Sequence, residues 1–189
     1  AAIAAYVVVF FHWNIVAYAA LAPIGCLLLG RRIGYWLHVA FGLVLVSGAL
    51  LTYTLTPLSL FGIADRGASA NYGWPGLAAR VIAAQRAHPQ SFVAAARYTY
   101  AAQLGFMLHD PSVPAFNALP SQTDAWWDPA ALRGRDAIIV ADGAQYSGIA
   151  EARKRFASVE KLEDVPVTDT LGRTVWTFQI WLGKGGSGG

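Results

Sequence analysis

The chain has 189 residues, 56% of them hydrophobic, and its mean hydropathy of +0.42 is above that of an ordinary soluble domain. All eleven acidic residues and twelve of the fourteen basic residues follow position 61, so the net charge of +3 hides a nearly balanced polar part. That part shows no basic stripe, which argues against nucleic acid as a partner. The composition predicts a membrane-anchored protein with a soluble domain of mixed charge.

Two apolar stretches flank the pair Arg31–Arg32. The second, residues 33–61, carries no formal charge and is longer than the roughly 20 residues that cross about 30 Å of hydrocarbon. The first, residues 1–29, is interrupted at 12–14 by His, Trp and Asn, so it is either one tilted helix or the end of an earlier span followed by another span from Ile15. We favour the second interpretation, because an unpaired amide or imidazole in hydrocarbon costs several kcal/mol.

The short turn at 31–32 is placed in the cytoplasm by the positive-inside rule. An arginine at the bilayer centre would cost about 3 kcal/mol or more, which argues against burying the pair. Residues 12–14 and everything after residue 61 then share the extracytoplasmic side. There the polar trio lines a chamber open to lipid headgroups, or it forms an ordinary interfacial belt; the pattern leaves both open.

Composition divides the chain into a membrane region at 1–61 with its cytoplasmic turn at 31–32, a linker at 62–74, an α/β domain at 75–182, and a flexible Gly/Ser tail at 183–189. The expected fold class is therefore a membrane α-helical segment followed by a small extracytoplasmic α/β domain. In the favoured interpretation the membrane segment holds two spans and the end of a third.

Within the soluble part, hydrophobic periodicity predicts helices and strands in alternation. In chain order they are a helix at 74–88, a strand at 91–96, a helix at 99–108, strands at 113–119 and 136–143, a helix at 147–159, and strands at 161–167 and 173–182.

Two of these segments predict how the layers are arranged. The continuous apolar run in 136–143 is typical of a strand covered on both faces. In 173–182, the alternate residues Trp176, Phe178, Ile180 and Leu182 face one way. In the helix at 74–88, Leu77, Val81, Ile82 and Ala84 supply the expected apolar face. We therefore expect a three-layered domain.

The sequence lacks the usual signatures of soluble enzymes, including phosphate-binding loops, the dinucleotide fingerprint, the nucleophile elbow and metal-spaced Cys or His pairs. Arg97 and Tyr98 follow a buried strand, at the edge where α/β sheets often bind ligands. The simpler interpretation is a surface arginine beside a packed tyrosine. Trp126 and Trp127, in a turn-rich loop, are suited to stack on a sugar, to rest on the bilayer interface, or to plug the base of the domain.

Three segments occur in an order that resembles a known family: "HWNIVAYAALAP" at 12–23, "RYTYAAQLGFML" at 97–108 and "LRGRDAIIVADG" at 132–143. They are similar to the C-terminal part of bacterial GT-C glycosyltransferases of family 39, the protein mannosyltransferase-like proteins related to the lipid A aminoarabinose transferases. The resemblance implies transfer of a sugar from a polyprenyl-phosphate donor to a lipid or other periplasmic acceptor. It also implies a bacterial inner membrane location, with the soluble domain in the periplasm.

The resemblance implies a role for eight residues: contact with the donor lipid or its phosphate for His12, Trp13, Asn14 and Tyr18, and substrate binding for Arg97, Tyr98, Trp126 and Trp127. The family's catalytic acid lies in an outer loop near the amino terminus, to which nothing here corresponds, so we expect this chain to be inactive alone. The cofactor is unknown, with a divalent metal open. The alternative is a non-catalytic transmembrane subunit that has a periplasmic docking domain and other chains as partners.

Overall fold

A computed structural model of the chain describes residues 32–57, 66–117, 124–125, 127–142 and 149–187. It forms two compact units, Ala1–Leu50 and Leu51–Gly189. The first apolar stretch, residues 1–29, lies outside the described residues, so the expectation of two spans can be compared with the structure only for the second stretch.

Helix α2 (Arg32–Thr54) forms from this second stretch. Its segment Gly34–Thr54 has 21 residues and, within the described part of the chain, is the one helix long and apolar enough to cross a membrane. Large apolar side chains such as Leu37 and Val44 are exposed along its length. A helix that is apolar on all sides suits lipid rather than water. The described residues therefore hold one candidate span, and the other expected span falls on residues 15–29, outside the described part of the chain.

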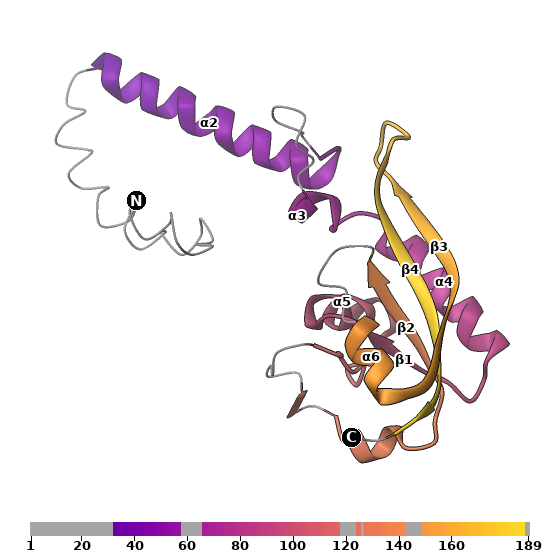
Figure 1. Ribbon diagram of the computed structural model, residues 1–189. Coiled ribbons are helices and arrows are strands. Elements are labelled where there is room, and N and C mark those ends of the chain that lie inside the picture. The colour runs from indigo at the N-terminus through magenta and orange to yellow at the C-terminus, as the bar shows by residue number, and fades with distance from the viewer. Residues whose placement is uncertain (1–31, 58–65, 118–123, 126, 143–148, 188–189) are drawn as a thin grey trace. The chain divides into compact units, whose positions relative to one another are not determined.

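The second unit is built around a mixed sheet. Its described strands are β1 (Phe92–Ala95), β2 (Ala137–Asp142), β3 (Phe156–Thr168) and β4 (Thr174–Gly186), in the order β1-β2-β4-β3. Strand β1 is parallel to β2, whereas β4 is antiparallel to both of its neighbours. Strands β3 and β4 form a ribbon that extends well past the end of β2 (Figure 1).

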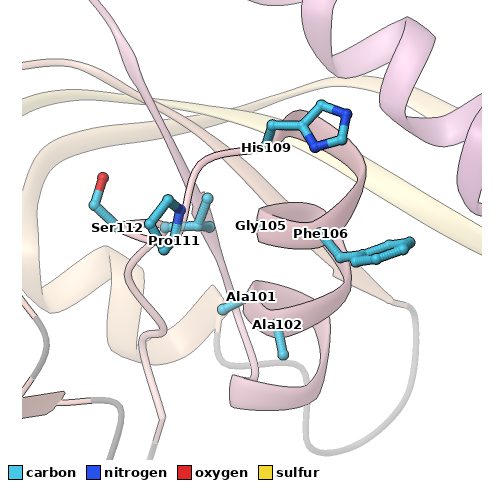
Figure 2. A pocket seen from close by; sticks show the side chains of 8 residues that line it. Ala101, Ala102, Gly105, Phe106, His109, Pro111 and Ser112 are labelled. Carbon is cyan, nitrogen blue, oxygen red and sulfur yellow. The ribbon is translucent and has the colours of Figure 1, made fainter.

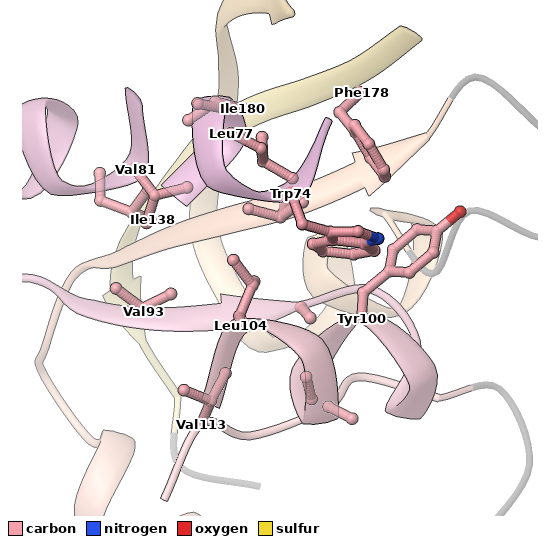
Figure 3. Close-up of a cluster of buried hydrophobic side chains, with 14 of the residues drawn as sticks. Trp74, Leu77, Val81, Val93, Tyr100, Leu104, Val113, Ile138, Phe178 and Ile180 are labelled. Atoms are coloured by element: carbon pink, nitrogen blue, oxygen red, sulfur yellow. The ribbon is translucent and has the colours of Figure 1, made fainter. Parts of the chain in front are cut away.

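Helices cover both faces of this sheet. Strand β2 is buried along its whole length, as expected. Its residues Ile138 and Val140 join the cluster that packs against α4 (Trp74–Ala87) and α5 (Tyr98–Leu108), shown in Figure 3. Its residue Ile139 packs on the opposite face against α6 (Ile149–Arg155). The expected three layers are therefore confirmed.

Helix α4 matches its predicted range because strong local signals bound it. Gly73 caps it in the left-handed conformation, at φ 79°, and Pro75 sits in its first turn, where no helical N–H is needed. Leu77 and Val81 are fully buried on the sheet side, and burial of side chains of this size contributes about 1.5–3 kcal/mol each. Ile82, expected on the same apolar face, is instead exposed.

Two predicted elements in the middle of the domain were wrong in extent. The expected strand at 113–119 is reduced, in its described part, to one bridge between Ala115 and Ala95, beside Pro114, which has no N–H to donate. The expected helix at 147–159 ends at Arg155, and β3 begins at Phe156. Pairing of Phe156 with Gly186 and burial of its ring outweigh the local helical pattern.

Both segments expected to be irregular contain regular structure. The predicted linker 62–74 holds the short helix α3 (Arg66–Ser69). In the predicted flexible tail, residues 183–186 continue β4. The Gly186 N–H donates to the Arg135 carbonyl over 2.9 Å. A Cβ added at Gly186 would lie 2.4 Å from the Leu132 carbonyl oxygen, so glycine is required by a close backbone approach rather than by flexibility.

The turn of the β3–β4 ribbon is joined to the residues that follow α2 by a buried carboxylate. The Thr56 hydroxyl donates to Asp169 Oδ2 over 2.7 Å, and Arg173 Nε donates to the same oxygen over 3.0 Å. The backbone N–H groups of Leu171 and Arg173 donate to Asp169 Oδ1 over 2.9 and 3.0 Å. We call Thr56, Asp169 and Arg173 the Asp169 junction.

The electrostatics of the Asp169 junction favour the ionised acid. Burial by itself raises the pKa of Asp169, but hydrogen bonds from Thr56, Arg173 and Leu171 outweigh burial and hold the pKa well below its usual range. Since the folded-state pKa is depressed, the unfolded carboxyl binds a proton first as the pH falls. The stabilisation is therefore complete at neutral pH, begins to fall below about pH 4, and is lost only as the pH falls through the depressed folded-state pKa.

We predict that Gly186→Ala lowers the free energy of unfolding by about 1–3 kcal/mol, because the new methyl group has no room beside the Leu132 carbonyl. The control is Gly76→Ala on α4, where nothing lies within 4 Å of the added carbon. That change should be neutral or stabilising by about 0.5–1 kcal/mol. Thermal unfolding in detergent measures both, and equal effects would contradict the strand assignment of residues 183–186.

We also predict that Asp169→Asn lowers Tm at pH 7 and that the difference from the parent begins to shrink as the pH falls below about 4, where the parent starts to lose the stabilisation. Thermal melts at several pH values measure this. The matched control is Asp164→Asn, whose carboxylate is exposed beside Lys161 and should matter little at any pH. A Tm difference independent of pH would contradict the ionised junction.

Candidate functional site

Of the eight residues proposed from the sequence, three are described by the structure. His12, Trp13, Asn14 and Tyr18 lie outside the described residues, as does Trp126. Arg97, Tyr98 and Trp127 are described, and each has different surroundings.

Arg97 belongs to a charged cluster at the carboxyl ends of the parallel strands β1 and β2. Its Nη1 lies 3.7 Å from Asp142 Oδ2, and the Tyr100 hydroxyl donates a hydrogen bond to the same oxygen. The Arg97 Cζ also lies 5.4 Å from the centre of the Tyr100 ring, which is a cation–π distance. We call Arg97, Tyr100 and Asp142 the carboxyl-edge cluster.

The three members of this cluster are positioned by the end of β2 and by the start of α5. Asp142 ends β2 and shares the face of Ile138 and Val140, because side chains alternate along a strand. Arg97 is the extended N-cap residue of α5, and Tyr100 follows three residues later in the first helical turn. The sheet and the helix therefore bring together groups more than forty residues apart in sequence.

Burial makes the cluster asymmetric. The Asp142 side chain is fully buried, whereas that of Arg97 is 41% exposed. Burial raises the pKa of Tyr100, and the hydrogen bond to Asp142 and its charge raise it further, more than Arg97 lowers it. The phenol therefore stays protonated at neutral pH and donates to the carboxylate. The arrangement presents a positively charged guanidinium to solvent on a buried acidic support, which suits the binding of an anion.

Tyr98 does not join this cluster, although it is next to Arg97 in sequence. Its side chain is 53% exposed, and its backbone N–H donates to Asn117 Oδ1 over 2.8 Å. Arg97 and Tyr98, which the sequence placed side by side as substrate-binding residues, therefore have different surroundings, and the role of Tyr98 stays a prediction. Tyr100 and Asp142 were missed, although an acid directly after the apolar run "AIIVA" was a usable signal.

Trp127 lies on the opposite face of the sheet and at the opposite end of β1. Its ring packs edge-on against Phe116, with centroids 6.1 Å apart, and the Arg155 Cζ lies 5.8 Å from its centre. Its Nε1 is buried and has no hydrogen-bond partner among the described residues. Trp127 is thus partly buried against the core on this face of the sheet, and the three roles expected for it stay open.

Trp127 also lines a pocket of about 370 Å³. Its polar lining includes Gln85, Asp110, Asp128 and Arg135. An aromatic wall with carboxylates and an amide is compatible with a carbohydrate. The carboxylates already have local roles, because Asp128 caps the 3₁₀ turn Pro129–Leu132 and Asp110 accepts from Ser112. The structure therefore separates Trp127 from Arg97 rather than combining them in one substrate site.

A larger pocket, of about 860 Å³, lies beside α5 and is mainly apolar (Figure 2). Small residues such as Ala101 and Gly105 line it together with Pro111 and Val113. Phe106 extends away from the helix and is 73% exposed. His109 is its titratable lining residue, and it ends α5 in the left-handed conformation. The pocket thus offers apolar contact surface but few groups for chemistry.

No group of three or more His, Cys, Asp or Glu side chains suited to hold a metal ion occurs among the residues that the structure describes. The described part of the carboxyl-edge cluster holds one carboxylate, and a metal site normally needs several oxygen or nitrogen ligands. A divalent metal therefore has no set of ligands in the described part of the chain.

We predict that Tyr100→Phe lowers the free energy of unfolding by about 1.5–3 kcal/mol, because it removes a hydrogen bond to a buried charged acceptor. Tyr98→Phe, two residues earlier on the same helix, should lower the free energy of unfolding by less than about 0.5 kcal/mol, since the Tyr98 side chain is exposed. Chemical denaturation of both variants measures the difference. Equal small effects would show that the bond to Asp142 does not stabilise the fold.

Comparison with protein-family models, with curated proteins and with solved structures gave no match.

Proposed function

We propose that this chain is the C-terminal portion of an integral membrane glycosyltransferase that moves a sugar from a polyprenyl-phosphate donor to a lipid or other periplasmic acceptor. The observation that carries the proposal is the end of the sheet at which the carboxyl-edge cluster lies. Asp142 pairs with Phe178, four residues beyond the start of β4 at Thr174. At about 3.4 Å per residue, this places the cluster roughly 14 Å along the sheet from the turn that is bonded to Thr56.

That position matters because a lipid-linked donor keeps its phosphate at the membrane surface. Thr56 comes two residues after the candidate span Gly34–Thr54. A group that binds the donor phosphate has to lie close to this exit from the membrane, and Arg97 meets that requirement. The Trp127 pocket is near the Gly186 end of β4, a further 8 residues from Phe178 or about 27 Å. It is better placed for a part of the acceptor that extends away from the membrane.

The chemistry of the cluster suits a binding role. Transfer of a glycosyl group leaves a lipid phosphate with developing negative charge, which a positioned guanidinium stabilises. Asp142 and Tyr100 hold Arg97 in place, and Asp142 is buried, so it is poorly placed to take a proton from an acceptor hydroxyl. The resemblance assigns that base to an outer loop nearer the amino terminus, so the role proposed for this chain is to bind and orient substrate.

A second function, a non-catalytic membrane subunit with a docking domain, is favoured by one observation. The α5 pocket is apolar and Phe106 beside it is 73% exposed, a surface typical of contact with another molecule. The intact mass of the native polypeptide separates the two functions. A chain several hundred residues longer, with an acidic residue in its first outer loop, supports the transferase, whereas a natural start near residue 1 supports the subunit.

We predict that Arg97→Gln weakens binding of polyprenyl phosphate about tenfold, equivalent to about 1.4 kcal/mol, since one charge-assisted contact is lost. A titration of the native polypeptide in lipid nanodiscs measures this. The control is Arg86→Gln in the last turn of α4, which removes an exposed arginine at a different end of the domain. The same titration in the presence of EDTA tests whether a divalent metal takes part in the binding of polyprenyl phosphate. Unchanged affinity in Arg97→Gln would refute the phosphate-binding role.

A further inference from the structure

We infer that the turn between β3 and β4 (residues 169–173) contacts the membrane and that the Leu171 side chain enters the lipid headgroup region. The proposed occupant of this surface is the leaflet at which the candidate span ends. The inference rests on the proposed function in one respect: it requires Gly34–Thr54 to cross a membrane.

The turn is fixed to the segment at which that span ends. The Thr170 N–H donates to the Leu55 carbonyl over 3.3 Å, and the Thr170 hydroxyl donates to the same oxygen. The Thr56 hydroxyl donates to Asp169. Leu55 directly follows the last residue of the candidate span, Thr54. A turn held within hydrogen-bond distance of this residue has to lie at the membrane surface wherever the span ends.

The turn presents an apolar side chain outward. Leu171 is 67% exposed, one of the most exposed large apolar side chains of the second unit. Its backbone is held by hydrogen bonds: the Leu171 N–H donates to Asp169 Oδ1, and the Gly172 N–H donates to the Asp169 carbonyl over 3.0 Å. Gly172 supplies the positive φ of 76° that the turn requires. These hydrogen bonds thus hold the turn in a conformation that exposes the Leu171 side chain. Contact of this apolar side chain with water is unfavourable.

The charge distribution of the ribbon favours lipid as the neighbour. The carboxylate of Asp169 is fully buried and neutralised by Arg173, so the turn exposes no acid to an anionic headgroup. The Arg173 side chain is partly exposed and carries a positive charge, which anionic lipids attract. The middle of β3, in contrast, carries the exposed ion-pairing residues Lys161 and Asp164. The apolar residue is therefore at the turn, and the charged residues are farther from the candidate span.

A membrane-contacting turn would give the soluble unit a second attachment to the bilayer besides the chain itself. The same ribbon carries Phe178, which pairs with Asp142 of the carboxyl-edge cluster. The contact at Leu171 would therefore help to fix how far the Arg97 guanidinium lies from the lipid phosphate plane.

Depth-dependent fluorescence quenching tests the inference. Cys26, the one cysteine in the sequence, is first replaced by Ser. The variants Leu171→Cys, Leu162→Cys and Ser158→Cys are then labelled with the same environment-sensitive dye in vesicles of phosphatidylethanolamine and phosphatidylglycerol. Leu162 is a second partly exposed leucine, in the middle of β3, and Ser158 is exposed near the far end of the ribbon. We expect nitroxide lipids that quench at roughly 5–10 Å depth to quench the Leu171 label at least about twofold more than either control.

Equal lipid quenching at the three positions, or equal quenching by aqueous iodide, overturns the inference. A Leu171 label that stays aqueous in vesicles but becomes protected in native membranes indicates a protein partner and overturns it as well. Alkaline carbonate extraction separates the two proposals. A chain released from the membrane contradicts both, whereas a chain that remains there with an aqueous Leu171 label contradicts the membrane-contacting turn and leaves the proposed function intact.

Discussion

The arrangement of the second unit depends on the hydrogen bonds that the buried carboxylate of Asp169 accepts. This carboxylate joins the β3–β4 turn to Thr56, 113 residues earlier in the sequence. A buried carboxylate without partners would be strongly destabilising. Here it accepts from a hydroxyl, from two backbone N–H groups and from the Arg173 guanidinium. Satisfying this one group requires the residues after α2 and the end of the ribbon to come together, so it fixes which end of the sheet lies next to Thr56.

Once that end is fixed, the strand register gives the two candidate sites different surroundings. The carboxyl-edge cluster lies toward the β3–β4 turn, and the pocket beside Trp127 lies toward Gly186. Trp127 itself also packs on the face of the sheet opposite to Asp142. In the proposed function, the first site binds the donor phosphate and the second holds a part of the acceptor that extends farther from the membrane.

The carboxyl-edge cluster and the Asp169 junction are built from the same kinds of charged group but differ in geometry. Each has a buried carboxylate and a partly exposed arginine. At the junction, Arg173 lies 2.8 Å from the acid and completes its hydrogen bonds. In the cluster, Tyr100 donates the close hydrogen bond to the acid, and Arg97 Nη1 lies 3.7 Å from the same oxygen. The first arrangement completes the hydrogen bonds of a buried acid, whereas the second leaves the Arg97 side chain 41% exposed, as the proposed anion-binding role requires.

The sequence by itself determined the elements whose signals are local. The charge-free stretch after Arg32 predicted α2, Gly73 and Pro75 bounded α4, and the apolar run at 137–141 predicted a strand covered on both faces. Only the tertiary structure decided that Phe156 begins a strand, that Gly183–Gly186 pack tightly, and that Tyr100 and Asp142 join Arg97. The reason is that helix and strand periodicity depend on neighbours a few residues apart. Strand pairing, close backbone approach and the solvation of a buried carboxylate depend on groups far away in the sequence.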